Sequence, residues 1–471
     1  MIFGDRMFDL DKYINNIAVI TDAGEVFTYS DINRMQSELF AIINGRKLVV
    51  ALCSNTIGSL IGYICFINNS IVPIMLDKNI NLVLLKKLLN NYNPDYLWVP
   101  NEFEFFKDFN VKCTMCGYKL IEYNSHRKAI MFKELALLLT TSGTTGSPKL
   151  VRLSYKNVQS NTSSIISYLD ICENERAITV LPMSYTYGLS IINTHLYSGA
   201  CILLTDASVC EKRFWRFFNE YRGTSISGVP YTYEMLRKVN FANFCVPSLK
   251  TMTQAGGKLS VDDSEYFYDF AKNTNRRFFT MYGQTEATAR ISYLPFEYMR
   301  QKKGSVGIPV IGGKFKIVDD NNNKLKKYEI GEIVYEGDNV SLGYAFDQYD
   351  LIKGDENKKT LHTGDMGYID NDGFLYIQGR IDRSVKVLGN RINLNELEEI
   401  IQDIFRIQTI CIYYEKKIYI FLTKLPSKKI KEQISAITGL NRNFFVIKVI
   451  KEFPRNVIGK VEHKLLMNLL F

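Results

Sequence analysis

The sequence has no apolar run long enough to cross a membrane. Its longest apolar stretches, such as LIGYICFI at 60–67, fall far short of the roughly 20 residues that a membrane-spanning helix needs. The N-terminal segment MIFGDRMFDLDKY mixes acidic with apolar residues and has no small-residue cleavage site after an apolar core, so it does not resemble a signal peptide. We therefore expect a cytoplasmic protein without a membrane span.

Paired cysteines and clustered histidines are also scarce. Nine cysteines, an odd number, and four histidines are scattered over 471 residues, which favours reduced thiols over a disulfide framework. Only Cys113 and Cys116 form a CxxC pair. Without a second pair or a histidine cluster nearby, we interpret this spacing as incidental and expect neither a zinc site nor a redox site there.

Internal repeats, low-complexity tracts and long linkers are absent as well. The chain is 46% hydrophobic and 23% charged, which is ordinary for a soluble globular protein and excludes general disorder. Its length exceeds one typical domain but is too short for a long modular assembly. We expect one large domain and one small one.

The positive charge is concentrated near the C-terminus. Residues 384–471 contain 15 Lys and Arg against 8 Asp and Glu, so +7 of the net charge of +9 lies in the last fifth of the chain. Such a unit suits a phosphorylated cofactor or an acidic carrier protein, and it equally suits a solvated lysine-rich surface.

Short apolar runs alternate with helical patterns over the first 300 residues. LVVALC at 48–53 and SIVPIML at 70–76 flank an amphipathic stretch at 56–68, which is typical of buried strands between helices. From about Gly331 short strands with turns take over, and NDG at 371–373 indicates a hairpin. The sequence predicts an α/β fold of layered subdomains that ends in a small β-rich subdomain.

The last part of the chain has its own pattern. INLNELEEIIQDI at 392–404 predicts a helix with Asn393 or Asn395 near its N-cap, and CIYYE, KIYIFLTK and KEQISAITG predict two strands and a second helix. We expect a compact α+β domain at 382–471 that follows a large domain at 1–381.

A glycine-rich loop is the most informative local feature. An apolar strand leads into TTSGTTGSPK at 140–149, and a second short apolar run leads to Ser154, a plausible helix N-cap. Glycines allow tight turns, and backbone N–H groups, hydroxyls and Lys149 would suit a polyphosphate. The loop is not a Walker loop, because the GxxxxGK[ST] spacing is not met and because the loop leads into a strand rather than directly into a helix. A Ser/Thr/Gly-rich surface hairpin remains the alternative for the loop taken alone.

Five motifs in a fixed order resemble the adenylate-forming, AMP-binding superfamily of acyl-CoA synthetases, carrier-loading adenylation enzymes and luciferases. They are TSGTTGSPK at 141–149, MYGQTEA at 281–287, HTGDMGY at 362–368, GRIDRSVKVLGNRINLNELE at 379–398 and PRNVIGK at 454–460. A weaker motif, FTYSDIN at 27–33, extends the resemblance almost to the N-terminus.

The resemblance implies an ATP site with Mg²⁺. It implies that Glu286 binds Mg²⁺, that Thr285 contacts the α-phosphate, and that Asp365, helped by Arg380, accepts hydrogen bonds from the ribose hydroxyls. Adenine would stack on Tyr282 beside Gly283. The β- and γ-phosphates would lie against the loop residues Thr141, Ser142, Gly143, Thr144, Thr145, Gly146 and Lys149.

The resemblance also implies a small domain that rotates between two half-reactions. Lys460 would bridge the substrate carboxylate and the α-phosphate during adenylation, so we count it with Thr285 and Glu286 as catalytic. Asp382 occupies the hinge position, and Gly389 would then approach a tunnel for the incoming thiol. Arg391 would lie near the phosphate of whichever partner is bound.

The acid pocket is expected around LPMSYTYGLS at 181–190. Tyr185 stands where the family often has histidine, or an aspartate in amino-acid activators, which argues against an amino acid without excluding one. Aromatic side chains beside glycines suggest a non-basic organic acid, although the tyrosines could also be core aromatics. The predicted walls are Tyr185, Tyr187, Gly188, Val229, Pro230, Tyr231, Ala255, Gly256 and Gly257.

The sequence leaves two thiols as candidates for the acyl acceptor. Free CoA is the first expectation, and a separate phosphopantetheine carrier protein is the second, since the sequence contains no carrier motif of its own. A luciferase-like oxidoreductase and a non-catalytic nucleotide- or acyl-binding relative are the rival interpretations. The non-catalytic alternative predicts loss of Lys460, Glu286 or Asp365, and all three are present.

Overall fold

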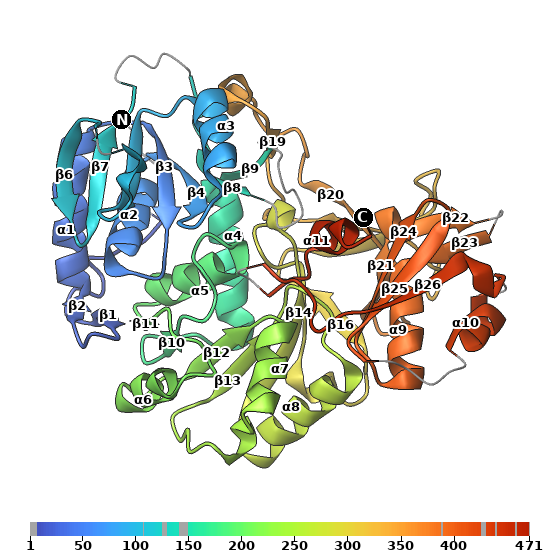
Figure 1. Ribbon diagram of the computed structural model, residues 1–471. Helices are drawn as coiled ribbons and strands as arrows, with labels where there is room; N and C mark the ends of the chain where they lie inside the picture. Colours follow the sequence, from blue (N-terminus) through green and yellow to red (C-terminus); the bar gives the residue numbers. More distant parts are fainter. Residues whose placement is uncertain are drawn as a thin grey trace. The chain divides into compact units, whose positions relative to one another are not determined.

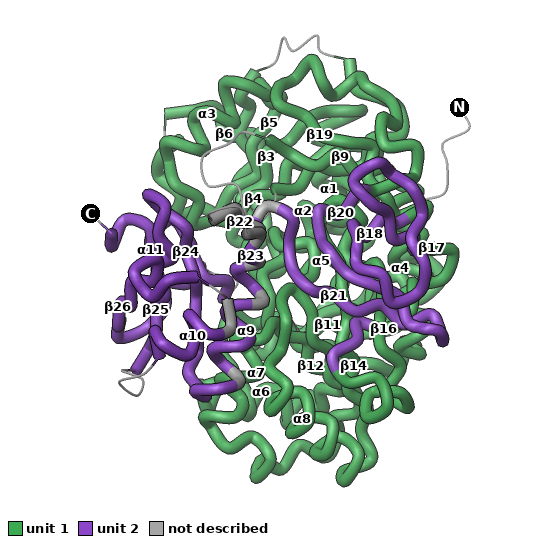
Figure 2. The backbone as a smooth tube through the Cα atoms, turned by 90° about the vertical axis from the view of Figure 1, so that its right-hand side faces the viewer, with its two compact units in different colours: residues 1–303, 307–314, 336–361 green, residues 304–306, 315–335, 362–471 purple. Residues whose placement is uncertain are grey.

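The structure is a computed structural model that describes residues 7–106, 108–124, 130–140, 149–387, 390–424, 430–438, 440–456 and 459–470. The chain divides into two compact units, which Figure 2 shows in green and purple. Unit 1 comprises residues 1–303, 307–314 and 336–361, and unit 2 comprises residues 304–306, 315–335 and 362–471. A separate domain that begins at residue 382 stays a prediction.

The first sheet of unit 1 has a buried parallel centre. The strand order is β19-β9-β8-β4-β3-β5-β7-β6, and β3 pairs in parallel with β4 and β5. All residues of β3 are buried, which explains its unbroken apolar sequence. The strands are β3 (Leu48–Cys53), β4 (Val72–Asp77), β5 (Tyr96–Pro100), β6 (Val111–Met115), β7 (Tyr118–Glu122), β8 (Leu135–Thr140), β9 (Leu150–Ser154) and β19 (Gly343–Ala345).

The second sheet of unit 1 brings the ends of three parallel strands to one edge. Its order runs β2-β1-β11-β10-β12-β13-β14-β15, with β12, β13 and β14 parallel. Loops after the carboxyl ends of parallel strands are the usual place for ligand sites. The strands are β1 (Ile17–Thr21), β2 (Val26–Thr28), β10 (Arg176–Ile178), β11 (Cys201–Leu204), β12 (Ser225–Gly228), β13 (Thr251–Gln254), β14 (Arg277–Tyr282) and β15 (Ser292–Leu294), followed by β16 (Ser305–Pro309).

The helices of unit 1 cover these sheets (Figure 1). Residues of α2 and α5 join one apolar core with residues of both sheets, which explains why α2 is apolar on all sides. Ser154 caps α4 in a reciprocal pair with Asn157, as predicted. The helices are α1 (Tyr29–Ile43), α2 (Ile57–Asn68), α3 (Leu82–Tyr92), α4 (Tyr155–Leu169), α5 (Thr186–Tyr197), α6 (Lys212–Glu220), α7 (Pro230–Lys238) and α8 (Val261–Asn273).

The first part of unit 2 consists of β-strands, and the predicted hairpin joins β20 to β21. Its strands follow the order β17-β18-β20-β21. In the turn, Asp370 Oδ1 accepts hydrogen bonds from Asp372 N at 3.0 Å and Phe374 N at 2.8 Å, and Gly373 has a φ of +91°. The bounds are β17 (Lys314–Val318), β18 (Gly331–Glu336), β20 (Thr360–Ile369) and β21 (Leu375–Arg380).

The remainder of unit 2 is an α+β arrangement with its own core. Leu397 and Ile401 of α9 pack with Ile418 and Ile420 of β25 and with Phe445. The predicted helices and strands are confirmed, and so is the α/β fold class. The elements are β22 (Ser384–Val387), β23 (Asn390–Asn393), α9 (Leu394–Phe405), β24 (Thr409–Tyr414), β25 (Lys417–Leu422), α10 (Ile430–Thr438), β26 (Phe445–Val449) and α11 (His463–Asn468).

None of the helices in the described residues has the length and apolar character needed to cross a membrane. A cytoplasmic location stays a prediction.

Candidate functional site

Two paired strands hold the ends of the glycine-rich loop. β8 ends at Thr140 and β9 begins at Leu150, and these two residues are antiparallel partners. Lys149, the last residue of the motif, is described. The other predicted phosphate-binding residues lie outside the described residues, namely Thr141, Ser142, Gly143, Thr144, Thr145 and Gly146.

Lys149 and Glu286 contact the same tyrosine from different elements. Lys149 Nζ lies 3.5 Å from the ring centroid of Tyr344, and the Tyr344 hydroxyl donates a 2.8 Å hydrogen bond to Glu286 Oε1. Tyr344 lies on β19, opposite Val151 of β9. The Lys149–Tyr344–Glu286 cluster therefore gathers a cation and a hard oxygen ligand, the two groups that a metal-bound polyphosphate requires.

The backbone after β14 is shaped by a close approach. A Cβ atom on Gly283 would lie 1.8 Å from the carbonyl oxygen of Ala289, so this position needs glycine. Thr288 and Ala289 have φ values of +56° and +109°, which L-residues rarely adopt. Gly283 is thus required for the path of the chain, whatever it contacts in a ligand.

One amide side chain holds this strained segment in place. Asn339 Nδ2 donates to the carbonyl oxygens of Ala287 at 2.9 Å and Arg290 at 2.8 Å. The hydroxyl of Thr288 donates in turn to the Asn339 carbonyl oxygen at 2.7 Å. These hydrogen bonds with Asn339 therefore fix the backbone that carries Glu286 and Arg290. Thr285, within η3 (Thr285–Ala287), is buried.

The structure brings several of the predicted acid-pocket residues together. Tyr185, Tyr187, Val229 and Ala255 belong to one apolar cluster, and the rings of Tyr185 and Tyr187 meet edge to face at 6.3 Å. The Tyr185 hydroxyl lies 2.6 Å from where a Cβ atom on Gly256 would be, and Gly256 has a φ of +83°. A larger residue at 256 would displace Tyr185.

Other predicted pocket residues have different surroundings. A Cβ atom on Gly188 would meet the carbonyl oxygen of Pro182 at 2.3 Å, so this glycine is needed for helix packing. A Cβ atom on Gly257 would lie 3.2 Å from Pro230 Cγ. The side chain of Tyr231 is 37% exposed and lies outside the apolar cluster.

Burial keeps the pocket tyrosines protonated. It raises the pKa of Tyr185 to about 12, although the nearby Arg290 cation opposes the shift. Burial also raises the pKa of Tyr187, whose hydroxyl lies 2.9 Å from the Thr253 carbonyl oxygen and donates to it. Both tyrosines are therefore neutral hydrogen-bond donors at physiological pH.

Arg290 is a buried cation beside this pocket that the sequence analysis did not identify. Its side chain is 3% exposed, and its Cζ lies 3.9 Å from the ring centroid of Tyr187. Nε donates to Met281 Sδ at 3.3 Å, and a terminal nitrogen lies 3.5 Å from the Ala289 carbonyl oxygen. Among the side chains that the structure describes, no carboxylate forms an ion pair with Arg290.

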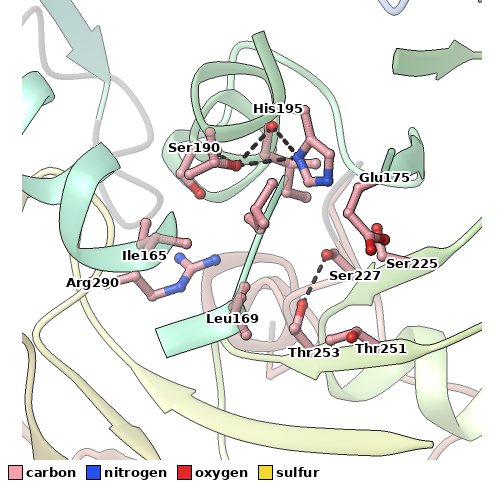
Figure 3. Close-up of a pocket in the computed structure, with 13 residues that line it drawn as sticks. Ile165, Leu169, Glu175, Ser190, His195, Ser225, Ser227, Thr251, Thr253 and Arg290 are labelled. Carbon is pink, nitrogen blue, oxygen red and sulfur yellow. Dashed lines mark hydrogen bonds between the residues drawn. The ribbon is translucent and has the colours of Figure 1, made fainter. Parts of the chain in front are cut away.

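The Arg290 guanidinium points into a small pocket, with Ser227 and Thr253 on the opposite wall (Figure 3). Its volume is about 30 Å³, which is enough for roughly two water molecules. Thr253 Oγ1 donates to Ser227 Oγ at 2.8 Å. Glu175 also lines this small pocket, and its carboxylate accepts a 2.9 Å bond from Lys250.

In unit 2, the predicted ribose-binding pair is assembled by strand register. Asp365 on β20 lies opposite Arg380 on β21, and Arg380 Nε lies 3.2 Å from Asp365 Oδ1. Asp365 is 8% exposed, and its backbone N–H donates to Thr363 Oγ1 at 3.1 Å. The guanidinium thus orients the carboxylate at the edge of the hairpin.

Lys460 ends a tight turn in unit 2. The backbone N–H groups of Lys460 and Gly459 donate to the side chain and the carbonyl oxygen of Asn456, at 3.0 and 2.9 Å. Gly459 has a φ of +77°, which favours glycine. Arg455 donates to the Gly459 carbonyl oxygen at 2.8 Å. This network fixes the backbone from which the Lys460 side chain extends.

The predicted hinge and tunnel residues are only partly described. Asp382 lies in η6 (Ile381–Arg383) and Arg391 lies on β23 opposite Lys386, but their side chains are outside the described part of the chain. Gly389 lies outside the described residues altogether. Their roles stay predictions.

A buried ion pair follows the hinge position. Arg383 donates to Asn395 Oδ1 at 2.9 Å and also to Glu398 Oε1. The backbone N–H of Cys411 donates to the same carboxylate oxygen at 2.6 Å. Burial raises the pKa of Glu398 to about 7, although Arg383 and the Cys411 N–H act in the opposite direction.

Sequence reasoning missed Tyr344, Arg290, Asn339 and Asn456. Arg290 follows the YGQTE motif by four residues, and Asn456 lies inside PRNVIGK, so closeness to a motif was the available indication for both. Tyr344 and Asn339 reach their partners through contacts between residues more than 50 positions apart, which no local pattern reveals.

Comparison with known sequences identifies the family. Residues 105–345, just over half of the chain, match the AMP-binding enzyme family, and the chain belongs to it. A 2-succinylbenzoate–CoA ligase of Bacillus cereus is 29% identical over 59% of this chain and 57% of its own length. An oxalate–CoA ligase of Saccharomyces cerevisiae is also 29% identical, over 57% of this chain and 48% of its own length. The chain thus matches about half of the length of these relatives.

Solved structures confirm the fold. An o-succinylbenzoate CoA synthetase from Bacillus subtilis, in complex with its acyl-adenylate intermediate, superimposes with a TM-score of 0.78 over 97% of both chains at 22% identity. An anthranilate CoA ligase in complex with anthranoyl-AMP gives a TM-score of 0.78 at 18% identity, over 98% of this chain and 97% of the other. The family match of residues 105–345 confirms the predicted superfamily resemblance.

Proposed function

We propose that this protein is an AMP-forming acid–thiol ligase that activates a carboxylic acid with ATP and Mg²⁺ and then transfers the acyl group to coenzyme A. The observation that carries the proposal is the Lys149–Tyr344–Glu286 cluster, which lies next to the paired ends of the glycine-rich loop. The proposal is supported by membership of the AMP-binding enzyme family and by relatives named as acid–CoA ligases.

In the first half-reaction, a carboxylate oxygen forms a bond to the α-phosphorus of ATP while the bond to the pyrophosphate oxygen breaks. Two anions must meet, so positive charge and oriented donors are required where charge develops. Lys149 supplies a cation at the end of the loop, and Thr285 supplies a hydroxyl for the α-phosphate. Bound Mg²⁺ would neutralise phosphate charge, and Glu286 fits it, because this ion usually takes one or two protein carboxylates besides phosphates and water.

Unit 2 would contribute to the same half-reaction through two groups. Asp365 is an acceptor held by Arg380 and suits the two ribose hydroxyls, since a carboxylate accepts two hydrogen bonds. Lys460 is the cation we assign to the substrate carboxylate and the α-phosphate, and its backbone is held by Asn456. Tyr282 remains the proposed stacking partner of adenine.

In the second half-reaction, the thiol sulfur forms the thioester bond, the acyl–phosphate bond breaks, and AMP leaves. We assign Asp382 to the hinge, Gly389 to the tunnel for the pantetheine arm and Arg391 to the partner's phosphate. CoA is preferred to a separate carrier protein because the relatives are named as CoA ligases. The excess of basic residues at 384–471 suits the phosphates of CoA.

A panel of acids with ATP and Mg²⁺ tests the first half-reaction through pyrophosphate release. Lys460→Ala should lower the release at least about 100-fold, because it removes a cation that acts where charge develops. Lys451→Ala removes an exposed lysine of the same unit and should leave the rate unchanged. The proposal fails if no acid gives release, or if the two variants behave alike.

Two further variants test the proposed Mg²⁺ ligand and the proposed tunnel for the acyl acceptor separately. Glu286→Gln should raise the Mg²⁺ concentration required for half-maximal release, because it weakens a hard oxygen ligand. Gly389→Trp should abolish thioester formation with CoA while pyrophosphate release persists. Retention of both activities in Gly389→Trp would contradict the assignment of the tunnel.

A further inference from the structure

We propose that Arg383 is a positioning residue for Lys460, because it joins the segment that follows the hinge to the base of the turn that carries this lysine. A rotation at Asp382 would then move Lys460 together with the segment after the hinge. The inference rests on the proposed function, since it deepens the roles assigned there to Asp382 and Lys460.

The turn that carries Lys460 is closed at its base. The backbone N–H of Glu462 donates to the carbonyl oxygen of Pro454 at 2.9 Å. Within the turn, the Lys460 N–H donates to the side chain of Asn456. His463 follows the base directly and is the first residue of α11. Because the backbone on both sides of Lys460 is bonded, the direction in which the lysine extends depends on how this base is held.

Apolar packing holds the base against the sheet. Phe453, just before the turn, and Leu466 of α11 belong to one apolar cluster with Phe421 of β25. Hydrophobic contacts of this kind are non-directional. The orientation of the turn relative to the segment after the hinge therefore depends on polar contacts, which have preferred directions.

Arg383 provides a polar contact of this kind. It directly follows Asp382, and its guanidinium donates to Asn395 Oδ1 at 2.9 Å and to Glu398 Oε1, both on α9. It also lies 3.2 Å from His463 Nδ1 at the start of α11. A guanidinium can only donate, so the His463 ring is neutral in this contact and accepts at Nδ1. The planar fork of arginine lets one side chain reach both helices in fixed directions.

The contact with His463 is not needed to neutralise the charge of Arg383. Glu398 already pairs with the guanidinium, and the side chain of Arg383 is only 18% exposed. His463 is exposed, and a bond to an exposed side chain adds little to stability. Its effect is on geometry, because it ties the base of the Lys460 turn to the residue next to the hinge. Misplacing a reacting group by about 1 Å can lower a rate by about 100-fold.

A double-mutant cycle with Lys460 tests the inference on the full chain. Pyrophosphate release is measured in single turnovers with ATP, Mg²⁺ and the best acid of the panel, at about pH 8, where Glu398 is ionised. Arg383→Met should lower the rate by about 10-fold and leave the ATP concentration for half-maximal rate unchanged within about twofold. In the Lys460→Ala background, Arg383→Met should cause no further loss, because its effect passes through the lysine.

A matched pair of variants at His463 keeps the buried ion pair intact. His463→Leu removes the acceptor and should lower the rate about three- to fivefold, whereas His463→Asn, whose Oδ1 can replace Nδ1, should restore most of it. The Tm of both variants should match that of the unmodified protein. Arg442→Met removes an arginine that pairs with the exposed Glu432 in the same unit, and it should change neither the rate nor the Tm.

The outcomes separate this inference from the proposed function. If Arg383→Met lowers the rate equally with Lys460 and with Ala at position 460, or if His463→Leu matches the unmodified protein, Arg383 serves the structure alone and the ligase proposal stands. If Lys460→Ala itself leaves release unchanged, the proposed role of the lysine fails, and this inference fails with it. If no acid gives release, both proposals fail.

Discussion

Arg152 and Arg290 are both buried in unit 1, but their surroundings differ. Arg152 is fully buried and donates to the carbonyl oxygens of Leu342 and Tyr344 at 3.0 Å and of Gly354 at 3.2 Å, and it also pairs with Glu356. Arg290 has no carboxylate partner among the described side chains, and its bonds are few and weak. A buried arginine with all donors engaged stabilises the chain, whereas one with donors to spare is suited to a ligand.

The largest expected effect concerns the engaged arginine. Arg152→Met should lower the free energy of unfolding by about 3 kcal/mol, because several carbonyl oxygens around β19 would lose their donors. Chemical denaturation measures the change. Glu356→Gln is the matched control and should cost only about 1 kcal/mol, since Glu356 is half exposed and the carbonyl bonds remain. Equal losses in the two variants would show that the ion pair alone matters.

The second prediction concerns Tyr344, whose backbone carbonyl oxygen accepts a hydrogen bond from Arg152. Tyr344→Phe keeps the aromatic face for Lys149 but removes the hydroxyl bonded to Glu286. Pyrophosphate release should fall by about 10-fold, which corresponds to about 1.4 kcal/mol, with little change in stability. Tyr349→Phe removes a hydroxyl from an exposed tyrosine nearby in the sequence and should change neither quantity. A loss of stability in Tyr344→Phe that matches its loss of activity would assign Tyr344 to structure alone.

Arg383 in unit 2 is the intermediate case, since its main partner is a single buried carboxylate. Burial raises the pKa of Glu398 from 4.5 to about 7, so the folded chain holds this proton more tightly than the unfolded chain. The resulting stability is complete below about pH 4.5 and is lost as the pH rises to about 7. Glu398→Gln removes this dependence, so across that range its free energy of unfolding should gain about 3 kcal/mol relative to the unmodified protein. If the difference in unfolding free energy between the two proteins does not change with pH, Glu398 stays ionised and paired with Arg383 throughout this range.

The smallest expected effect falls on the arginine with donors to spare. Arg290→Met should change the free energy of unfolding by less than about 1 kcal/mol without an acid present, because an apolar chain of similar length packs against Tyr187 in place of an unpaired charge. The measurement is the same denaturation as for Arg152→Met. A loss as large as that of Arg152→Met would remove the distinction between the two arginines.

Local patterns in the sequence predicted the fold well. The strands at 48–53 and 70–76, the hairpin at NDG and the cap at Ser154 depend on neighbours in sequence, and all are confirmed. The pairing of Asp365 with Arg380 also follows from a hairpin register that the motifs indicated.

Long-range contacts explain what sequence reasoning did not reach. Tyr344 meets Glu286 only because β19 pairs with β9, and no spacing encodes that contact. The burial of Arg290 depends on Tyr187, about 100 residues away, whereas an arginine beside a motif would ordinarily be solvated. Tyr231, a predicted pocket aromatic, is partly exposed and lies outside the apolar cluster, and its role stays a prediction.

The bonds from Asn339 to Ala287 and Arg290 have a consequence for how the two neighbouring side chains are placed. Because one amide clamps the backbone on both sides of the strained segment, the Glu286 and Arg290 side chains start from points whose separation is fixed. A change at Asn339 would therefore move both side chains without altering either residue.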